Sequence, residues 1–184
     1  MLMWSSVSSA QVEPRHEDHE ALRAILKVAG NALNTRDINS LAPVLSEKFI
    51  ITSVDQQTFT DLAAFNAYFQ GFFEGEKPPL KSIEFNPKAD ALTEFIGENV
   101  GLARGTSNDI YHFSSGTAKE MTTRWTATVV KENGAWKLAN LHLGVNVLDN
   151  PLIKTAKISF YWVGGVSFLI GLVLGFVLRR QRRS

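Results

Sequence analysis

The chain of 184 residues contains no cysteine and only four histidines. The absence of cysteine excludes disulfides, thiol catalysis and cysteine-ligated zinc. His16 and His19 lie three positions apart in a segment expected to be helical, so they could share a metal ion. A solvated first turn of a helix, with Glu17, Asp18 and Glu20 beside them, explains them more simply. We therefore expect no metal and no other cofactor.

The chain also lacks a strong charge of either sign. Its 19 basic and 18 acidic side chains leave a net charge of +1, which gives no basis for nucleic-acid binding. The length suits one domain with a small additional segment. We find no internal repeat and no low-complexity segment.

Charge is missing altogether from residues 159–178, "SFYWVGGVSFLIGLVLGFVL". As a helix this segment is about 30 Å long, which matches the hydrocarbon core of a bilayer. Tyr161 and Trp162 lie near one end, where interfacial aromatic residues are common. The rest of the chain is too small to surround such a helix in a core. The pattern predicts a single-pass transmembrane helix in the lipid bilayer.

The flanks of this segment predict its orientation. The tail 179–184 carries four arginines, whereas the predicted linker 151–158 carries Lys154 and Lys157. Positive charge stays cytoplasmic, so we expect the large domain outside, in a bacterium on the periplasmic side of the inner membrane. Residues 1–14 include "MLMWSSVSSA", which is similar to the end of a signal peptide but lacks a basic start. We interpret residues 1–14 as a signal-peptide remnant or a disordered leader.

Residues 15–150 contain the pattern of a folded domain. Apolar residues at helical spacing predict a helix over 17–34, and a shorter one is expected over 37–45. The strand "KFIITSV" follows, and a third helix with an aromatic stripe begins after Thr60 or Asp61. Further strands are predicted near 80–86, 91–105, 109–114, 118–131 and 135–147. This order indicates an α+β fold, a curved antiparallel sheet packed against N-terminal helices.

The dipeptide Asn133-Gly134 is a strong signal for a two-residue type I′ hairpin turn. Such a turn places Trp125 opposite His142, with Asn140 on the same face. That face is mostly apolar with a few polar points, as ligand pockets are. A bulge or a longer loop would shift the register and turn one strand over.

Two sets of candidate functional residues follow from this register. The predicted pocket contains Tyr68 from the third helix, Trp125, Asn140 and His142. The alternative for Asn140 and His142 is a hydrogen-bonded pair in the core. The opposite face carries Leu141 and Leu143, which suggests a surface buried in a dimer.

The predicted membrane helix offers a second surface for association. Gly171 and Gly175 lie four positions apart, on one stripe with Ser167 and Gly164. Small residues at this spacing let two helices approach closely, although glycine is also simply common in such helices. We expect a parallel homodimer.

The segment "RWTATVVKENGAWKLANLHLGVNVLDNP" resembles the last hairpin of the nuclear transport factor 2-like superfamily, which includes SnoaL-like and ketosteroid-isomerase-like domains. The order of elements over about residues 15–148 is similar too. The resemblance implies a cone-shaped sheet closed by helices, a pocket inside the cone, and dimers formed through the outer face of the sheet.

The resemblance does not decide the function. Ketosteroid isomerases use a tyrosine from the first helix and two aspartates. The first helix here has no tyrosine, and we expect Asp55 and Asp109 in a loop and a turn. The favoured hypothesis is a membrane-anchored, non-catalytic domain that binds a small apolar ligand or a partner protein. The alternatives are a lyase or isomerase with His142 as acid/base and Tyr68 or Tyr111 as donor, or a scaffold subunit of a membrane complex.

Overall fold

The structure is a computed structural model that describes residues 15–146, 148 and 151–181, and within 151–181 the side chains of 153 and 156–172. The N-terminal part contains α1 (His16–Thr35), the 3₁₀ helix η1 (Ile38–Val44), β1 (Leu45–Thr52), β2 (Thr58–Phe59) and α2 (Leu62–Gln70). The strands β3 (Leu80–Glu84), β4 (Pro87–Ala89), β5 (Glu94–Ile96), β6 (Val100–Phe113), β7 (Ala118–Glu132) and β8 (Ala135–Val145) follow, and then α3 (Pro151–Gln181).

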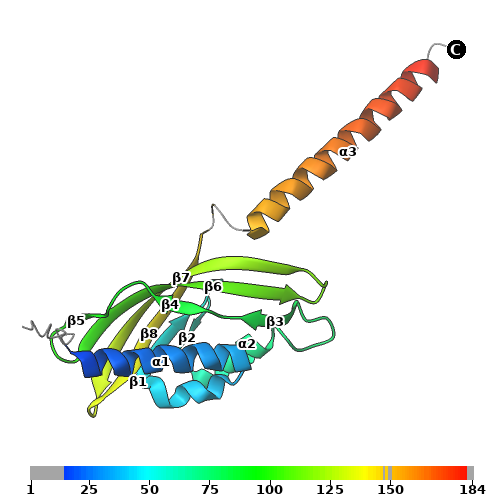
Figure 1. Cartoon of the computed structure of the whole chain (residues 1–184). Helices are drawn as coiled ribbons and strands as arrows, with labels where there is room; N and C mark the ends of the chain where they lie inside the picture. The colour runs from blue at the N-terminus through cyan, green and yellow to red at the C-terminus, as the bar shows by residue number, and fades with distance from the viewer. Residues whose placement is uncertain (1–14, 147, 149–150, 182–184) are drawn as a thin grey trace, which may run out of the picture.

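The helices form where the apolar periodicity predicts them. In α1 the buried positions include Leu22, Ile25 and Ala32, and this face packs on the curved sheet (Figure 1). The predicted second helix is a 3₁₀ helix that contains Pro43. Asp61 caps α2, because its side chain accepts a hydrogen bond of 2.7 Å from the backbone N–H of Ala64.

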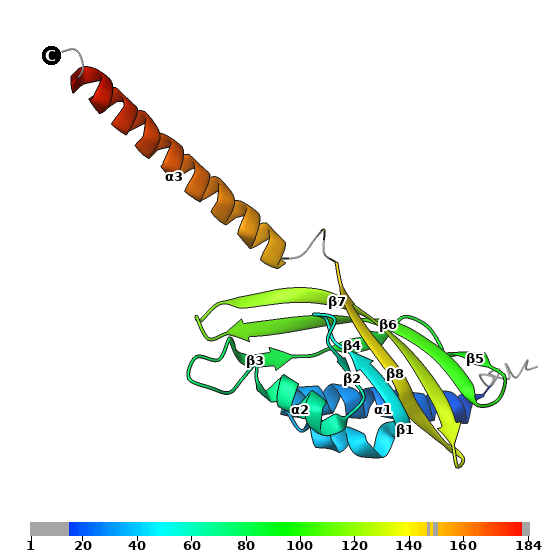
Figure 2. The ribbon, with the colours of Figure 1, turned by 180° about the vertical axis from the view of Figure 1, so that it is seen from behind.

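The sheet has the strand order β2-β1-β8-β7-β6-β3, and β4 and β5 also pair with β6. The architecture is the predicted α+β arrangement, a curled sheet packed against an N-terminal helix. One expectation was wrong, because β1 pairs with β8 in parallel, so the sheet is mixed (Figure 2). Nearly the whole domain lies between these strands in the chain, so their pairing needs no tight turn.

The strand β6 differs most from the sequence expectation. It runs without a break from Val100 to Phe113, and so includes Ser107 and Asn108, which lie in the gap between the predicted strands 91–105 and 109–114. Polar residues persist in this strand because their side chains find partners. The Ser107 hydroxyl donates to Asp109 on the inner face, and Asn108 accepts a hydrogen bond of 3.0 Å from the Thr122 hydroxyl.

The hairpin between β7 and β8 begins as predicted. Asn133 and Gly134 have φ of 49° and 79°, as a type I′ turn requires. The expected pairing continues to Val129 opposite Leu138, and there the register shifts, so that Thr128 lies opposite Asn140. The shift leaves one extra residue in β8 as a bulge.

The bulge reverses the orientation of the rest of β8. Trp125 lies opposite Leu143, and His142 lies opposite Thr126. The predicted pairing of Trp125 with His142 was therefore wrong. Because side chains alternate between the faces of a sheet, one extra residue moves every later side chain of β8 to the other face.

A charged cluster fastens the start of α1 to this hairpin. The Asp18 carboxylate accepts hydrogen bonds from Trp136 Nε1 at 2.7 Å, from Arg15 Nε at 2.7 Å and from Lys131 Nζ at 3.1 Å. These donors, Trp136 first, hold the pKa of Asp18 well below its usual range. The cluster joins the first turn of the domain to its last two strands.

The helix α3 extends away from the sheet (Figure 1). It begins at Pro151, so residues 151–158, predicted as a linker, are helical. Its described residues from 156 to 172 are all exposed. Within the part of the chain that the structure describes, no helix meets the length and apolarity needed to cross a membrane. Residues 1–14, the side chains of 173–178 and the end of the basic tail lie outside the described residues.

Candidate functional site

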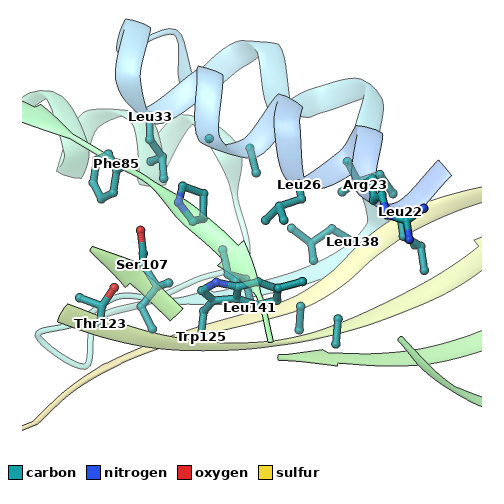
Figure 3. A pocket seen from close by; sticks show the side chains of 18 of the residues that line it. Leu22, Arg23, Leu26, Leu33, Phe85, Ser107, Thr123, Trp125, Leu138 and Leu141 are labelled. Atoms are coloured by element: carbon teal, nitrogen blue, oxygen red, sulfur yellow. The ribbon is translucent and has the colours of Figure 1, made fainter. Parts of the chain in front are cut away.

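An apolar cavity of about 140 Å³ lies between α1 and the inner face of the sheet (Figure 3). Helix α1 contributes one wall, which extends about 16 Å from Leu22 to Leu33. The opposite wall consists of inward side chains of β6, β7 and β8. Among these are Ala103, Ser107, Asp109, Tyr111, Thr123, Trp125, Ala127, Val129, Leu138, Leu141 and Leu143.

A buried carboxyl group belongs to the sheet wall of this cavity. Asp109 is 1% exposed. Its oxygens accept hydrogen bonds from the Ser107 hydroxyl, from the Thr123 hydroxyl at 3.1 Å and from the backbone N–H of Asn86 at 3.3 Å. Burial raises the pKa of Asp109, and the three donors only partly oppose this effect. The cavity therefore contains a carboxyl group that is a stronger base than an ordinary aspartate.

Tyr111 lies two residues further along the same face of β6. Its side chain also lines the cavity, and burial, together with the negative charge of Asp109, raises the pKa of its hydroxyl. The phenol is therefore protonated at neutral pH and can donate a hydrogen bond.

The indole of Trp125 forms part of the same wall, close to Leu141 (Figure 3). It is 6% exposed and lies against Gly105 of β6. A Cβ atom at Gly105 would lie 2.2 Å from Cζ2 of this indole and 2.1 Å from the carbonyl oxygen of Lys88. Only glycine allows the ring to lie so close to the β6 backbone.

The cavity opens between α1 and the segment that joins β4 to β5. Four of its lining residues are exposed, namely Arg23, Ala89, Ala91 and Leu92. His19 lines the cavity as well, but it is buried, and its ring packs against Phe95 with the centroids 5.0 Å apart. A ligand could enter here without passing the polar groups on the sheet wall.

The structure brings together only part of the predicted pocket. Trp125 lines the cavity, whereas Tyr68, Asn140 and His142 are absent from its lining. The Tyr68 hydroxyl instead shares a hydrogen bond of 2.9 Å with the Ser53 hydroxyl, and burial raises its pKa to about 12. His142 is exposed on the other face of the sheet, so the acid/base role that we considered for it finds no place in this cavity.

The predicted dimer surface is also changed by the bulge in β8. Leu141 and Leu143 line the cavity, so they belong to the inner face. The outer face carries His142 in their place. A Cβ atom added at Gly171 of α3 would meet no other part of the described chain within 4 Å, and the side-chain position of Gly175 lies outside the described residues.

The sequence reasoning missed Ser107, expected Asp109 in a turn, and considered Tyr111 only as a possible donor beside His142. Their spacing of two residues is the signal that could have found them, because alternate residues of one strand share a face. The expectation that Asp109 lies in a turn concealed this pattern. Among the described residues there is no group of three or more His, Cys, Asp or Glu side chains that could hold a metal ion.

Residues 22–147 match the sequence model of the SnoaL-like domain. A search of curated proteins gave no match. Solved structures with the same fold include three bacterial proteins. A candidate scytalone dehydratase from Novosphingobium aromaticivorans is 15% identical with a TM-score of 0.60, and the match covers 71% of this chain and 85% of that one.

The second is a hexachlorocyclohexane dehydrochlorinase from Novosphingobium barchaimii. It is 13% identical with a TM-score of 0.63, and the match covers 72% of this chain and 88% of that one. The third is an uncharacterized protein with a cystatin-like fold from Caulobacter vibrioides. It is 16% identical with a TM-score of 0.58, and the match covers 79% of this chain and 99% of that one. At these identities the similarity shows the fold alone.

Proposed function

The chain belongs to the SnoaL-like domain family, and we propose that its domain binds a small apolar ligand in the cavity between α1 and the sheet. One observation carries this proposal, the presence of an apolar cavity of about 140 Å³ with an exposed mouth. An engineered apolar cavity of roughly 150 Å³ in another protein binds benzene, so a molecule with one ring has a suitable size.

Binding of ethylbenzene to the full-length protein tests this proposal. The methyl resonances of Val129 and Leu138, which line the cavity, report occupancy. Ala29→Phe fills the cavity from α1, and Ala24→Phe places the same side chain on the exposed side of that helix. We expect ethylbenzene to shift these resonances in the wild type and in Ala24→Phe but not in Ala29→Phe. Equal shifts in both variants, or none in the wild type, contradict the proposal.

A second candidate function is proton transfer in a lyase or isomerase reaction. The observation that favours it is the buried carboxyl of Asp109 on the cavity wall, with its raised pKa. As a carboxylate, Asp109 would take a proton from a carbon of the substrate. The electron pair of that C–H bond would then expel a leaving group or move to a neighbouring carbonyl oxygen. Two of the structural neighbours are named for a dehydratase and a dehydrochlorinase, which is consistent with such a reaction.

Hydrogen exchange of the methyl group of acetophenone, a ketone with one ring, in deuterated water tests this candidate, because the exchange requires proton removal next to a carbonyl group. Loss of a general base lowers a rate by about 10²- to 10⁴-fold, so we expect Asp109→Asn to lose nearly all acceleration. Asp90→Asn, on the surface, is the matched control. The wild-type rate should rise with pH as Asp109 ionises. Equal rates for the wild type and Asp109→Asn exclude Asp109 as the base.

We also propose that residues 159–178 anchor the domain in a membrane. The segment has no charged residue, and its described part exposes large apolar side chains, including Phe160 at 81%, Tyr161 at 80% and Trp162 at 73%. The positive tail favours an orientation with the domain on the outer side of the membrane, which is the periplasmic side in a bacterium. Protease added to spheroplasts should digest the domain. A domain that survives, with the tail cleaved from outside, contradicts this orientation.

A homodimer remains our proposal for the assembled protein. The candidate surfaces are the outer face of the sheet, where Arg124, Thr126 and His142 are exposed, and the glycine stripe of α3. Because both surfaces lie on one chain, contact at one surface raises the effective concentration of the partner chain at the other. We expect a dimer by light scattering in mild detergent, weakened by Gly171→Leu combined with Gly175→Leu. A monomer at micromolar concentration rejects both surfaces.

A further inference from the structure

We propose that the ligand of the cavity is an amphipathic monocarboxylate, with an apolar body of about one ring inside the cavity and its carboxylate at the mouth, beside the guanidinium of Arg23. This inference rests on the proposed ligand-binding function and adds the chemical class of the ligand and its orientation to it.

The mouth of the cavity has a basic group, the side chain of Arg23. It is the one lysine or arginine among the described residues that line the cavity, and it is 48% exposed. On α1 it lies three residues before Leu26 and seven before Gly30, which also line the cavity. Residues at this spacing share one face of a helix. Arg23 therefore belongs to the stripe of α1 that faces the ligand, and it keeps contact with water.

The two ends of the cavity differ in charge. Figure 3 shows Arg23 and Ser107 at opposite ends, and the Ser107 hydroxyl donates to the buried carboxyl of Asp109. A carboxylate at the Ser107 end would lose its water and would lie near a second carboxyl group. At the Arg23 end it keeps part of its water and gains a cation. The carboxylate of the ligand therefore lies at the mouth, and its apolar body points inward, toward Trp125.

The acidic residues between β4 and β6 are paired on the other side of the sheet. Asp90 forms an ion pair of 2.6 Å with Arg124 and accepts a hydrogen bond of 3.0 Å from the Thr106 hydroxyl, and Glu94 is paired with Arg104. These partners alternate along β6 and β7 with the side chains that line the cavity, so they lie on the outer face. Each of the two acids thus has a cation other than Arg23.

The acidic group that does contact Arg23 is Glu20. The two form an ion pair about one turn apart on α1, and the Glu20 side chain is 55% exposed. An exposed pair of this kind contributes little free energy, and a guanidinium has five N–H donors. A ligand carboxylate can therefore bind beside Glu20 or replace it. Glu20 does not line the cavity, so the ion pair leaves the mouth open.

The walls determine the body of the ligand. The volume of about 140 Å³ admits one ring, by comparison with the roughly 150 Å³ that hold benzene elsewhere. The wall of α1 beyond Arg23 is apolar, with Leu26, Ala29 and Leu33. A polar substituent on the ring would lose its water against this wall without gaining a partner there. A phenyl ring joined to a carboxylate by a short chain of methylene groups fits this description.

The probes for this inference are 3-phenylpropionate and 3-phenylpropanamide, because they have nearly the same shape and differ in charge. The methyl resonances of Val129 and Leu138 in the full-length protein report binding, as they do for ethylbenzene. Arg23→Gln removes the cation at the mouth. Lys27→Gln is the matched control, because Lys27 is exposed on the same helix, does not line the cavity and gives the same change in net charge.

We expect the carboxylate to bind about two- to fivefold more tightly than the amide at low ionic strength, which is the effect of one exposed ion pair. This preference should disappear in Arg23→Gln and in about 1 M salt, where the Debye length is about 3 Å. It should persist in Lys27→Gln. Glu20→Gln should increase it, because a competing carboxylate has been removed.

The outcomes separate this inference from the proposed function. If both probes bind the wild type with equal affinity, the cavity binds apolar ligands but the assigned carboxylate is wrong. If Arg23→Gln and Lys27→Gln reduce the preference equally, the overall charge of α1 attracts the carboxylate, and the assignment to Arg23 is wrong. If neither the probes nor ethylbenzene shift the methyl resonances, the proposed function and the inference both fail.

Discussion

Replacement of Gly105 by alanine tests how tightly the cavity wall is packed. The new Cβ atom would lie 2.1 Å from the Lys88 carbonyl oxygen and 2.2 Å from Cζ2 of Trp125. Ordinary contacts between such atoms are about 3.5 Å, so both neighbours must move by more than about 1 Å. The Lys88 oxygen belongs to β4 and can move only if the pairing of β4 with β6 is disturbed. The indole lines the cavity, so the cavity gives it space to move.

We expect a loss of about 3 kcal/mol in the free energy of unfolding, at the upper end of the range for overpacked cores. In a domain of this size that corresponds to a decrease in Tm of about 10 °C. The displaced indole would also occupy space that the ligand needs, so binding of ethylbenzene should weaken together with stability. Chemical denaturation and calorimetry of the full-length protein measure the first effect, and the methyl resonances measure the second.

Gly144→Ala provides the control for this experiment. Gly144 also lies in a strand, but a Cβ atom there would meet only the Arg124 carbonyl oxygen, at the ordinary distance of 3.9 Å. We expect a change within about 0.5 kcal/mol. If Gly105→Ala is as stable as Gly144→Ala and still binds ethylbenzene, the close packing of Trp125 against β6 is wrong.

Three further outcomes follow from the carboxylates and from the placement of His142. Asp18→Asn should lower the free energy of unfolding by about 2 kcal/mol, because hydrogen bonds to a neutral amide are weaker than those to the charged carboxylate. Asp90→Asn, which removes an exposed ion pair, should lower it by less than about 1 kcal/mol. Because the pKa of Asp18 is lowered on folding, the contribution of its charge to stability is complete above about pH 4 and disappears as the pH falls toward the folded-state pKa. The denaturation curves of the wild type and Asp18→Asn should therefore converge in acid. Asp109 has the opposite sign, because its pKa is raised on folding. Its contribution to the stability of the wild type is complete below about pH 4 and is lost as the pH rises through the folded-state pKa. Asp109→Asn should therefore gain stability relative to the wild type as the pH rises above about 4, and a difference that stays constant with pH would contradict the burial of Asp109. His142→Ala should change stability by less than about 0.5 kcal/mol and leave ethylbenzene binding intact, because the side chain is exposed on the outer face.

The sequence by itself determined those features that depend on neighbours in the chain. The apolar spacing in α1 predicts a helix with one buried face, and it forms from His16 to Thr35. The preference of Asn133-Gly134 for positive φ predicts a type I′ turn, and both residues adopt it. Together with the resemblance of the last hairpin to the superfamily, these signals were enough for the fold class.

The tertiary structure alone decided which residues form the site. The bulge in β8 depends on strands on both of its sides, because the pairing of β8 with β1 and with β7 shifts at the same place, between Leu138 and Asn140. Local periodicity carries no information about such a shift, and one residue of shift exchanged His142 for Leu141 and Leu143 on the inner face. The position of Asp109 also depends on residues that are distant in the chain. Next to Asn108 it has the local pattern of a turn. In the structure it lies within a strand, where its carboxyl group accepts hydrogen bonds from the hydroxyls of Ser107 and Thr123 and from the Asn86 amide.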